Sequence, residues 1–218
     1  LKWIRESSEK SQGKIISIDG KSFRRSHDRS RAQNMLHLVH AWASQNHILL
    51  GEVKTDEKSN EITAIPQLLK MLALKSAIVT VDAMGTQTDI AEQIHDAKGD
   101  YVMALKGNHG TAHEEIKQYW EDKELGHDAA CYETVEKGHG RIEERRYQIS
   151  EDIDWFEDKG KWKGLTSIGC VESKRTVRDE TSVEHRYYLT SLKANAEEFA
   201  EAVRAHWRVE NSLHWVLD

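Results

Sequence analysis

The feature that most constrains the fold is an unbroken, mostly apolar run at residues 77–82, Ala-Ile-Val-Thr-Val-Asp, which lies between two segments with helical spacing. A short run of this kind is typical of a strand that helices bury on both faces. Residues 101–105 form a second such run. We therefore expect an α/β fold whose central strands are covered by helices.

Three short β-type segments precede these runs, and their close spacing favours an antiparallel meander over residues 14–19, 35–43 and 47–54. The order of all elements predicts a mixed five-stranded sheet flanked by helices, with the first and fourth strands as parallel neighbours. A β-rich insertion is expected before the last helix. The other expected elements are helices from about Ile62, Thr86, Thr111 and Asn195, with Thr86 and Asn195 as N-terminal caps of their helices, and hairpins over residues 131–149 and 165–190.

The domain organisation expected from this order is one core interrupted by the insertion. The chain begins at Leu1 without a methionine and stops at Asp218 inside a helical pattern, so we expect a fragment truncated at both ends. The expected parts are an N-terminal segment at 1–13, a first part of the core at 14–123, the insertion at 124–190 and a final core helix at 191–218.

Composition limits the protein class. The chain has 218 residues, of which 38% are hydrophobic and 31% charged, and no apolar run approaches the roughly 18 residues that a membrane helix requires. Cys131 and Cys170 match neither a disulfide framework nor a zinc pattern, which is typical of a reducing compartment. We expect a soluble protein of the cytoplasm with no membrane partner.

The net charge of -6 argues mildly against binding to nucleic acid, but the charges are unevenly distributed. One basic group is Lys21, Arg24, Arg25, Arg29 and Arg31, and another is Arg141, Arg145 and Arg146. A solvated charged face is the commoner explanation for such runs, and contact with phosphate is the alternative.

Three acidic residues form the candidate catalytic site. Asp19 ends the run Ile-Ile-Ser-Ile, Asp82 ends the run Ile-Val-Thr-Val, and Glu210 lies on the apolar face of the final helix. Each has an ordinary explanation when taken singly: Asp19-Gly20 is a common turn pair, Asp82 closes a strand, and Glu210 could pair with Arg204 or His206.

Taken together, the three acids point to a metal site. Two carboxylates about 4 Å apart repel by on the order of 4 kcal/mol at an effective dielectric near 20, and a bound cation relieves that repulsion. Oxygen ligands favour Mg²⁺ or Mn²⁺ over zinc. Paired divalent ions suit phosphodiester cleavage because they neutralise charge on the attacking and leaving oxygens.

Two other site types are disfavoured. The twelve histidines show no His-Glu-x-x-His spacing and have no cysteine cluster beside them, which argues against zinc. Residues 106–110, Lys-Gly-Asn-His-Gly, lack the spacing of a nucleotide-binding phosphate loop. They follow a strand, however, and the carboxyl ends of strands are where α/β sheets place ligands.

The sequence resembles the bacterial insertion-sequence DDE transposases, in particular the H-repeat-associated group, from about residue 14 to 218. The blocks that carry the resemblance are Ile18-Asp-Gly-Lys21, Asp56-Glu-Lys-Ser-Asn-Glu-Ile62, Thr80-Val-Asp-Ala-Met84, Ala104-Leu-Lys-Gly-Asn108, Gly138-His-Gly-Arg-Ile-Glu143 and His206-Trp-Arg-Val-Glu-Asn211.

This resemblance implies a ribonuclease H-like fold in which Asp19, Asp82 and Glu210 are the catalytic residues and hold two Mg²⁺ ions, with Mn²⁺ able to substitute. It implies that water cleaves DNA at transposon ends and that the freed 3′-hydroxyl attacks target DNA. A homodimer in a synaptic complex is expected. The alternatives are a nuclease or resolvase of the same fold without strand transfer, and an inactive DNA-binding remnant of a mobile element.

Some related transposases place Tyr, Arg and Lys around the catalytic Glu, at positions that hold Val203, His206 and Leu217 here, so the DNA contacts of that set do not carry over. Other positions are candidates instead. They are Lys21, Arg24 and Arg25 in the first basic run, Lys106, Asn108 and His109 in the loop after the fifth strand, His139 and Arg141 at a hairpin tip, and Arg204 and Arg208 on the last helix.

Overall fold

The computed structural model describes residues 15–23, 36–55, 61–122, 128–138 and 140–209, and the chain divides into two compact units. The first unit contains residues 1–103 and 202–218, and the second contains residues 104–201. Strand β5 and helix α5 each contribute residues to both units.

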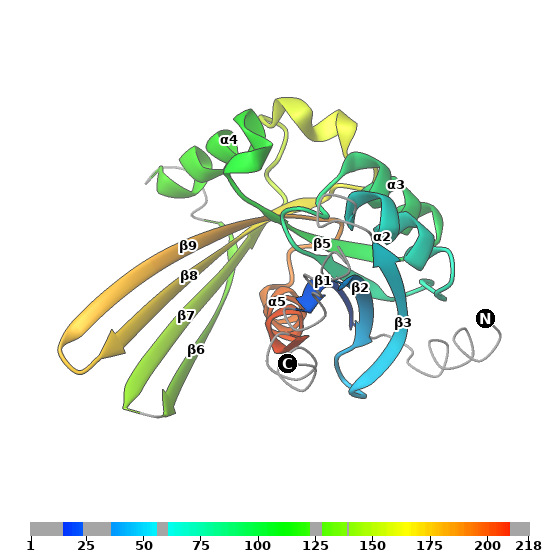
Figure 1. Cartoon of the computed structure of the whole chain (residues 1–218). Helices are drawn as coiled ribbons and strands as arrows, with labels where there is room; N and C mark the ends of the chain where they lie inside the picture. The colour runs from blue at the N-terminus through cyan, green and yellow to red at the C-terminus, as the bar shows by residue number, and fades with distance from the viewer. Residues whose placement is uncertain (1–14, 24–35, 56–60, 123–127, 139, 210–218) are drawn as a thin grey trace. The chain divides into compact units, whose positions relative to one another are not determined.

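The first unit holds the strands expected at the start of the chain, in the spatial order β3-β2-β1-β4-β5 (Figure 1). Strands β1, β2 and β3 are antiparallel, whereas β1 pairs with β4 and β4 with β5 in parallel. The meander and the parallel β1–β4 neighbours are thus confirmed. The elements are β1 (Ile15–Phe23), β2 (Leu36–Ala43), β3 (Ile48–Thr55), α2 (Glu61–Leu69), β4 (Ile78–Val81), α3 (Thr88–Asp96), β5 (Asp100–Leu105) and the end of α5 (Ala196–Val209).

Helices bury the sheet of the first unit, as the apolar runs predict. All four residues of β4 are buried. On one face, α2 packs closely, with Leu68 against Gly51 of β3 and Ile65 against Gly85. On the other face, Val209 at the end of α5 packs with Trp42 of β2. A mixed α/β architecture is therefore confirmed.

The second unit contains an antiparallel four-stranded sheet in the order β9-β8-β7-β6. Both expected hairpins are present, and they also pair with each other through β7 and β8. In the described residues the sheet has nine strands, so the expected five-stranded sheet with the hairpins as a separate insertion is wrong in its strand number. The elements are the 3-10 turn η3 (Gly107–His109), α4 (Thr111–Glu121), β6 (Ala130–Gly138), β7 (Arg141–Ser150), η4 (Glu157–Lys161), β8 (Ser167–Val177), β9 (Glu180–Thr190) and the start of α5.

Aromatic residues form the core of the second unit. The Phe199 ring on α5 lies edge-on to Tyr147 and Tyr188, with centroids 6.5 and 5.4 Å away. It fits against β8 because Gly169 has no side chain there. Asn195 caps α5 as expected, since the Glu198 N–H donates to its Oδ1 at 3.2 Å.

Two expected boundaries are wrong. Strand β1 does not end at Asp19 but continues to Phe23, because β2 supplies antiparallel partners as far as Leu36. Thr86 does not cap α3, which begins at Thr88; its hydroxyl donates to the Asp82 carbonyl instead, at 2.9 Å. In the described part of the chain, no helix has the length and apolar character needed to cross a membrane.

Candidate active site

Asp19 and Asp82 follow the last paired residues of two adjacent parallel strands. The β1–β4 pairing ends with Ile18 opposite Val81, and each aspartate is the residue that directly follows. Neighbouring strands lie about 4.8 Å apart. The fold thus brings together two acids that are 63 positions apart in the sequence.

Backbone amides orient both carboxylates. The Gly20 N–H donates to Asp19 Oδ1 at 2.9 Å. Asp82 Oδ1 accepts from the N–H groups of Met84 at 3.0 Å and Gly85 at 2.9 Å, which wraps the chain around the carboxylate. Such hydrogen bonds restrict the rotamers that each carboxylate can adopt. Both side chains remain partly exposed.

A buried histidine is the cross-strand neighbour of Asp19. His40 of β2 pairs in register with Asp19 and is only 1% exposed. Burial, together with the nearby charges of His37 and Lys21, lowers the pKa of His40 to about 4, so this imidazole is neutral at pH 7. Asp19 therefore has an uncharged, water-excluding neighbour on this side.

On the other face of β1 lies a buried polar pair, Glu61 and His37. The Glu61 Oε1 of α2 lies 2.5 Å from the His37 Nε2 of β2, and both side chains are at most 5% exposed. The Glu61 carboxylate lies against the backbone of Gly20, where a side chain would collide with it. Gly20 thus permits α2 to approach β1 directly beside Asp19.

Helix α5 is joined to the strands that carry the aspartates by a chain of buried hydrogen bonds. His206 Nδ1 lies 2.9 Å from Thr80 Oγ1, which lies 3.1 Å from Ser17 Oγ. Ser17 Oγ is 3.1 Å from Ser44 Oγ, and Ser44 donates to the Ala205 carbonyl at 3.2 Å. The network starts and ends on α5.

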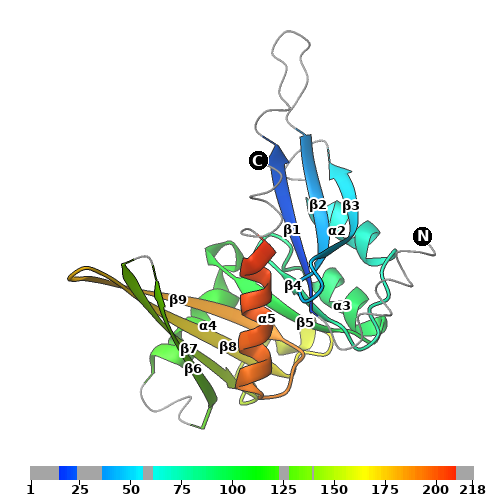
Figure 2. The same ribbon diagram turned by 90° about the horizontal axis from the view of Figure 1, so that it is seen from below.

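These contacts also fix the direction of α5. Ala205 lies beside Ser44, whose N–H donates to Ile15 at the start of β1. Val209 packs against Trp42, the register partner of Ser17. The helix therefore advances in the same direction as β1, and Figure 2 shows the red end of α5 and the arrowhead of β1 pointing the same way.

Glu210 lies outside the described residues, directly after Val209, which ends α5. Among the described residues, no group of three or more His, Cys, Asp or Glu side chains is placed to hold a metal ion. The predicted trio thus has two members whose positions are described, and these are adjacent.

The candidate DNA contacts are dispersed. Lys21 is buried, at 9% exposure, which does not suit contact with a phosphate. Arg208 on α5 is exposed and Arg204 is partly exposed. Arg24, Arg25 and His139 lie outside the described residues.

The loop after β5 belongs to the second unit. Lys106 and Asn108 are exposed, His109 is partly exposed, and the Asn108 Nδ2 lies 3.2 Å from His109 Nε2. The backbone folds there into η3, immediately before α4. All three side chains are therefore accessible to a ligand.

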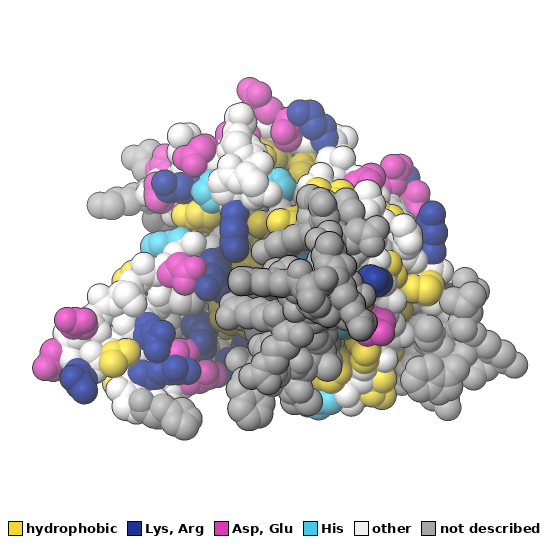
Figure 3. All heavy atoms as spheres, viewed as in Figure 1, with side chains coloured by type: hydrophobic (Ala, Val, Ile, Leu, Met, Phe, Trp, Pro, Cys, Tyr) yellow, Lys and Arg dark blue, Asp and Glu magenta, His cyan; other side chains and the backbone are white. Residues whose placement is uncertain are grey.

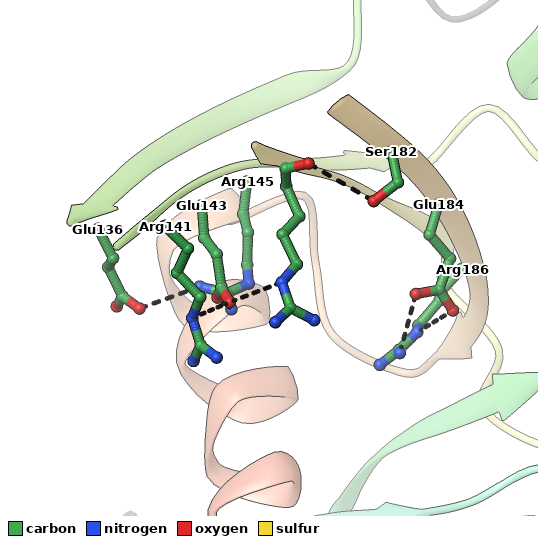
Figure 4. A network of polar contacts seen from close by, with 8 residues as sticks. Glu136, Arg141, Glu143, Arg145, Ser182, Glu184 and Arg186 are labelled. Carbon is green, nitrogen blue, oxygen red and sulfur yellow. Dashed lines mark hydrogen bonds and ion pairs between the residues drawn. The ribbon is translucent and has the colours of Figure 1, made fainter. Parts of the chain in front are cut away.

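Arg141 belongs to a network of alternating charges on the hairpin strands (Figure 4). Glu143 of β7 pairs with Arg141 at 2.8 Å, with Arg175 at 3.9 Å and with Arg145, which also reaches Glu136 at 3.1 Å. Figure 3 shows Lys and Arg side chains gathered over strands β6–β9 with acidic ones among them. Most of this positive charge is matched by neighbouring carboxylates.

Sequence reasoning missed the buried polar residues around the aspartates. A signal was present: Ser17 and Thr80 are the polar members of otherwise apolar strand runs, and each stands two positions before an aspartate. The Glu61–His37 pair had no comparable signal, since it depends on which helix covers β1.

Comparisons with known proteins are consistent with the geometry. Residues 10–218 match the family described as transposase DDE domain. The chain is 43% identical over 223 residues to "Putative transposase YncI" of Escherichia coli O157:H7, with 100% of this chain and 57% of that protein covered. It is 42% identical over 226 residues to "H repeat-associated putative transposase YhhI" of Escherichia coli strain K12, with 100% and 59% covered.

The chain therefore spans less than three fifths of the length of these relatives. Among solved structures, a piggyBac transposase synaptic complex with hairpin DNA aligns with 92% of this chain and 39% of that chain, at a TM-score of 0.48 and 10% identity.

Proposed function

Because the chain belongs to the DDE transposase family, we propose that it is the catalytic core of an enzyme that cuts DNA at transposon ends and joins those ends to target DNA. Asp19, Asp82 and Glu210 are the catalytic residues of this proposal. Its fold would be ribonuclease H-like, with residues 124–190 inserted before the helix that leads to Glu210.

The observation that carries the proposal is the register of β1 and β4. It makes Asp19 and Asp82 neighbours at the same end of parallel strands. Helix α5 runs toward that end, and Glu210 follows its last described residue.

The donor set fits Mg²⁺, with Mn²⁺ as a substitute. Carboxylate oxygens are hard ligands, and both aspartates keep partly exposed side chains whose orientation is set by backbone amides. When bound, divalent cations would neutralise charge on the attacking and leaving oxygens of the scissile phosphate. The protein's own part is to hold the carboxylates in place and to exclude water on the His40 side of Asp19.

DNA is the proposed substrate, both as transposon ends and as target. Lys106, Asn108, His109, Arg204 and Arg208 are accessible candidates for contact with it. Synapsis of two ends would need two copies of the protein, so we propose a homodimer as the active assembly.

The test is cleavage by the full-length protein on DNA that carries the terminal repeats of its own element. Wild-type protein should nick this DNA only with Mg²⁺ or Mn²⁺, and Asp19→Asn or Asp82→Asn should reduce the rate at least about a hundredfold, because each removes a charged ligand. Asp89→Asn, which changes an exposed acid on α3, is the matched control and should cleave normally. Unchanged cleavage by Asp19→Asn would refute the proposal.

A second arm separates the transposase from a nuclease of the same fold. Pre-cleaved ends with free 3′-hydroxyls are supplied together with target plasmid. A transposase joins them, whereas a nuclease or resolvase leaves the ends unjoined, and an inactive remnant neither cuts nor joins.

A further inference from the structure

The hydrogen-bond chain beneath the aspartates has a defined direction. Thr80 donates its hydroxyl proton to Ser17, and Ser44 donates its own to the Ala205 carbonyl. A hydroxyl has one proton, so Ser17 must donate to Ser44, and the His206 Nδ1–H must donate to Thr80. Each hydroxyl thus donates once and accepts once.

The chain forms a closed circuit through three elements. It leaves α5 at the His206 ring, passes through β4 and β1 to Ser44 after β2, and returns to α5 at the Ala205 carbonyl. Ser17, Ser44 and Thr80 are at most 2% exposed. Buried polar groups with complete partners hold one arrangement, because any shift leaves a donor or acceptor unpaired.

Two members of the circuit stand two positions before the candidate catalytic aspartates. Ser17 is two positions before Asp19, and Thr80 is two before Asp82, which is about 6.6 Å along a strand. His206 is four positions before Glu210, which lies outside the described residues.

We propose that Ser17, Thr80 and His206 are positioning residues that fix β1, β4 and α5 against one another, so that Asp19 and Asp82 are held at the spacing that a divalent cation requires. This inference rests on the proposed function. Apolar packing alone is non-directional and would let the helix slide or rotate.

The variant Thr80→Val tests this role because it keeps the shape of the side chain and removes the hydroxyl at the centre of the circuit. The readout is binding of Mn²⁺ alone, without DNA, to the full-length protein, followed by electron paramagnetic resonance. Affinity should fall about tenfold or more, as is usual when a group that orients a metal ligand is lost. Thr80→Ser, which restores the hydroxyl, should recover wild-type affinity.

The matched control is Thr190→Val in the second unit. Thr190 is fully buried, and its hydroxyl accepts from the Leu192 N–H at 3.0 Å. This variant loses a buried hydroxyl of the same kind, so it should lower the melting temperature and leave Mn²⁺ affinity unchanged.

A second readout follows the proton on His206. In the wild type, ¹⁵N chemical shifts should place it on Nδ1, because the circuit requires a donor there. In Thr80→Val the proton should leave Nδ1 in favour of the more common Nε2 tautomer. If Thr80→Val does not fold, His206→Leu is the substitute, with His206→Asn as the variant that keeps a donor near the Nδ1 position.

The outcomes separate the two claims. If Asp19→Asn abolishes Mn²⁺ binding while Thr80→Val binds as the wild type does, the positioning role is wrong and the proposed function stands. If the wild type binds no Mn²⁺, or binds it as well as Asp19→Asn does, the proposed function itself is wrong. A lower melting temperature in Thr80→Val with unchanged Mn²⁺ affinity also overturns the positioning role, since the network is then only structural.

Discussion

The substitution Gly20→Ala tests how closely α2 packs against β1 beside Asp19. A Cβ at Gly20 would lie 2.3 Å from Glu61 Oε1, 2.5 Å from Cδ and 2.9 Å from Oε2. The Glu61 carboxylate has little room to withdraw, because it is buried and lies 2.5 Å from His37 Nε2. In this variant either the Glu61–His37 pair separates, or β1 shifts at Gly20, which is adjacent to Asp19.

The expected cost of Gly20→Ala is about 3 kcal/mol of unfolding free energy. Overpacking a core costs about 1–3 kcal/mol, and leaving a buried polar group without its hydrogen-bond partner costs about 1–3 kcal/mol. In a chain of this size, a loss of about 3 kcal/mol lowers the melting temperature by about 6–12 °C. An alanine in open strand geometry would do the opposite and stabilise by up to about 1 kcal/mol.

Urea unfolding of a double-mutant cycle checks the reasoning. Gly20→Ala should be strongly destabilising in the wild-type background and nearly neutral in Glu61→Ala, which removes the colliding carboxylate. Gly138→Ala is the matched control, since this glycine ends β6 and has no neighbouring atom within 4 Å of its Cβ position. Equal effects of Gly20→Ala in both backgrounds would refute the packing argument.

Two further predictions concern buried titratable groups. His40 has a folded pKa of about 4 against an ordinary 6.5, so the unfolded chain binds its proton first and stability falls as pH drops below 6.5. Between pH 7 and pH 5 wild-type protein should lose about 2 kcal/mol that His40→Gln does not lose, and equal losses in urea titrations would contradict this. Burial raises the pKa of the Cys170 thiol to about 12, so this thiol should react slowly with an alkylating reagent at pH 8. Mass-spectrometric mapping should find the exposed Cys131 labelled in the folded protein and Cys170 labelled only in urea. Similar labelling rates at both cysteines would show that Cys170 is accessible.

Periodicity predicted the elements that carry their own pattern. The apolar run of β4 and the alternation of the two hairpins are local signals, and both are present in the structure. The parallel pairing of β1 and β4 followed from the order of elements and the handedness of crossovers, and it is the step that brought Asp19 and Asp82 together.

Local signals failed where tertiary partners decide. Asp19-Gly20 has the composition of a turn, yet β1 continues because β2 pairs with it and because Glu61 fills the space that Gly20 leaves. Thr86 has the composition of a helix cap, but its hydroxyl bonds to the Asp82 carbonyl. In both cases the residues can form the predicted local structure, but the contacts that they make in the fold favour a different one.

The polar circuit beneath the aspartates marks a similar limit. Ser17 and Thr80 are visible in the sequence as polar breaks in apolar strands, but their connection to His206 requires knowing that α5 crosses those two strands. The placement of α5 depends on Trp42 and Val209, whose contact joins residues 167 positions apart.

The most direct test of the central claim is a crystal structure of the full-length protein with Mn²⁺, recorded with anomalous scattering. The account predicts an anomalous peak within bonding distance of carboxylate oxygens from Asp19, Asp82 and Glu210 together. A Glu210 side chain well beyond the reach of both aspartates, or Mn²⁺ bound elsewhere in an otherwise intact fold, would contradict it.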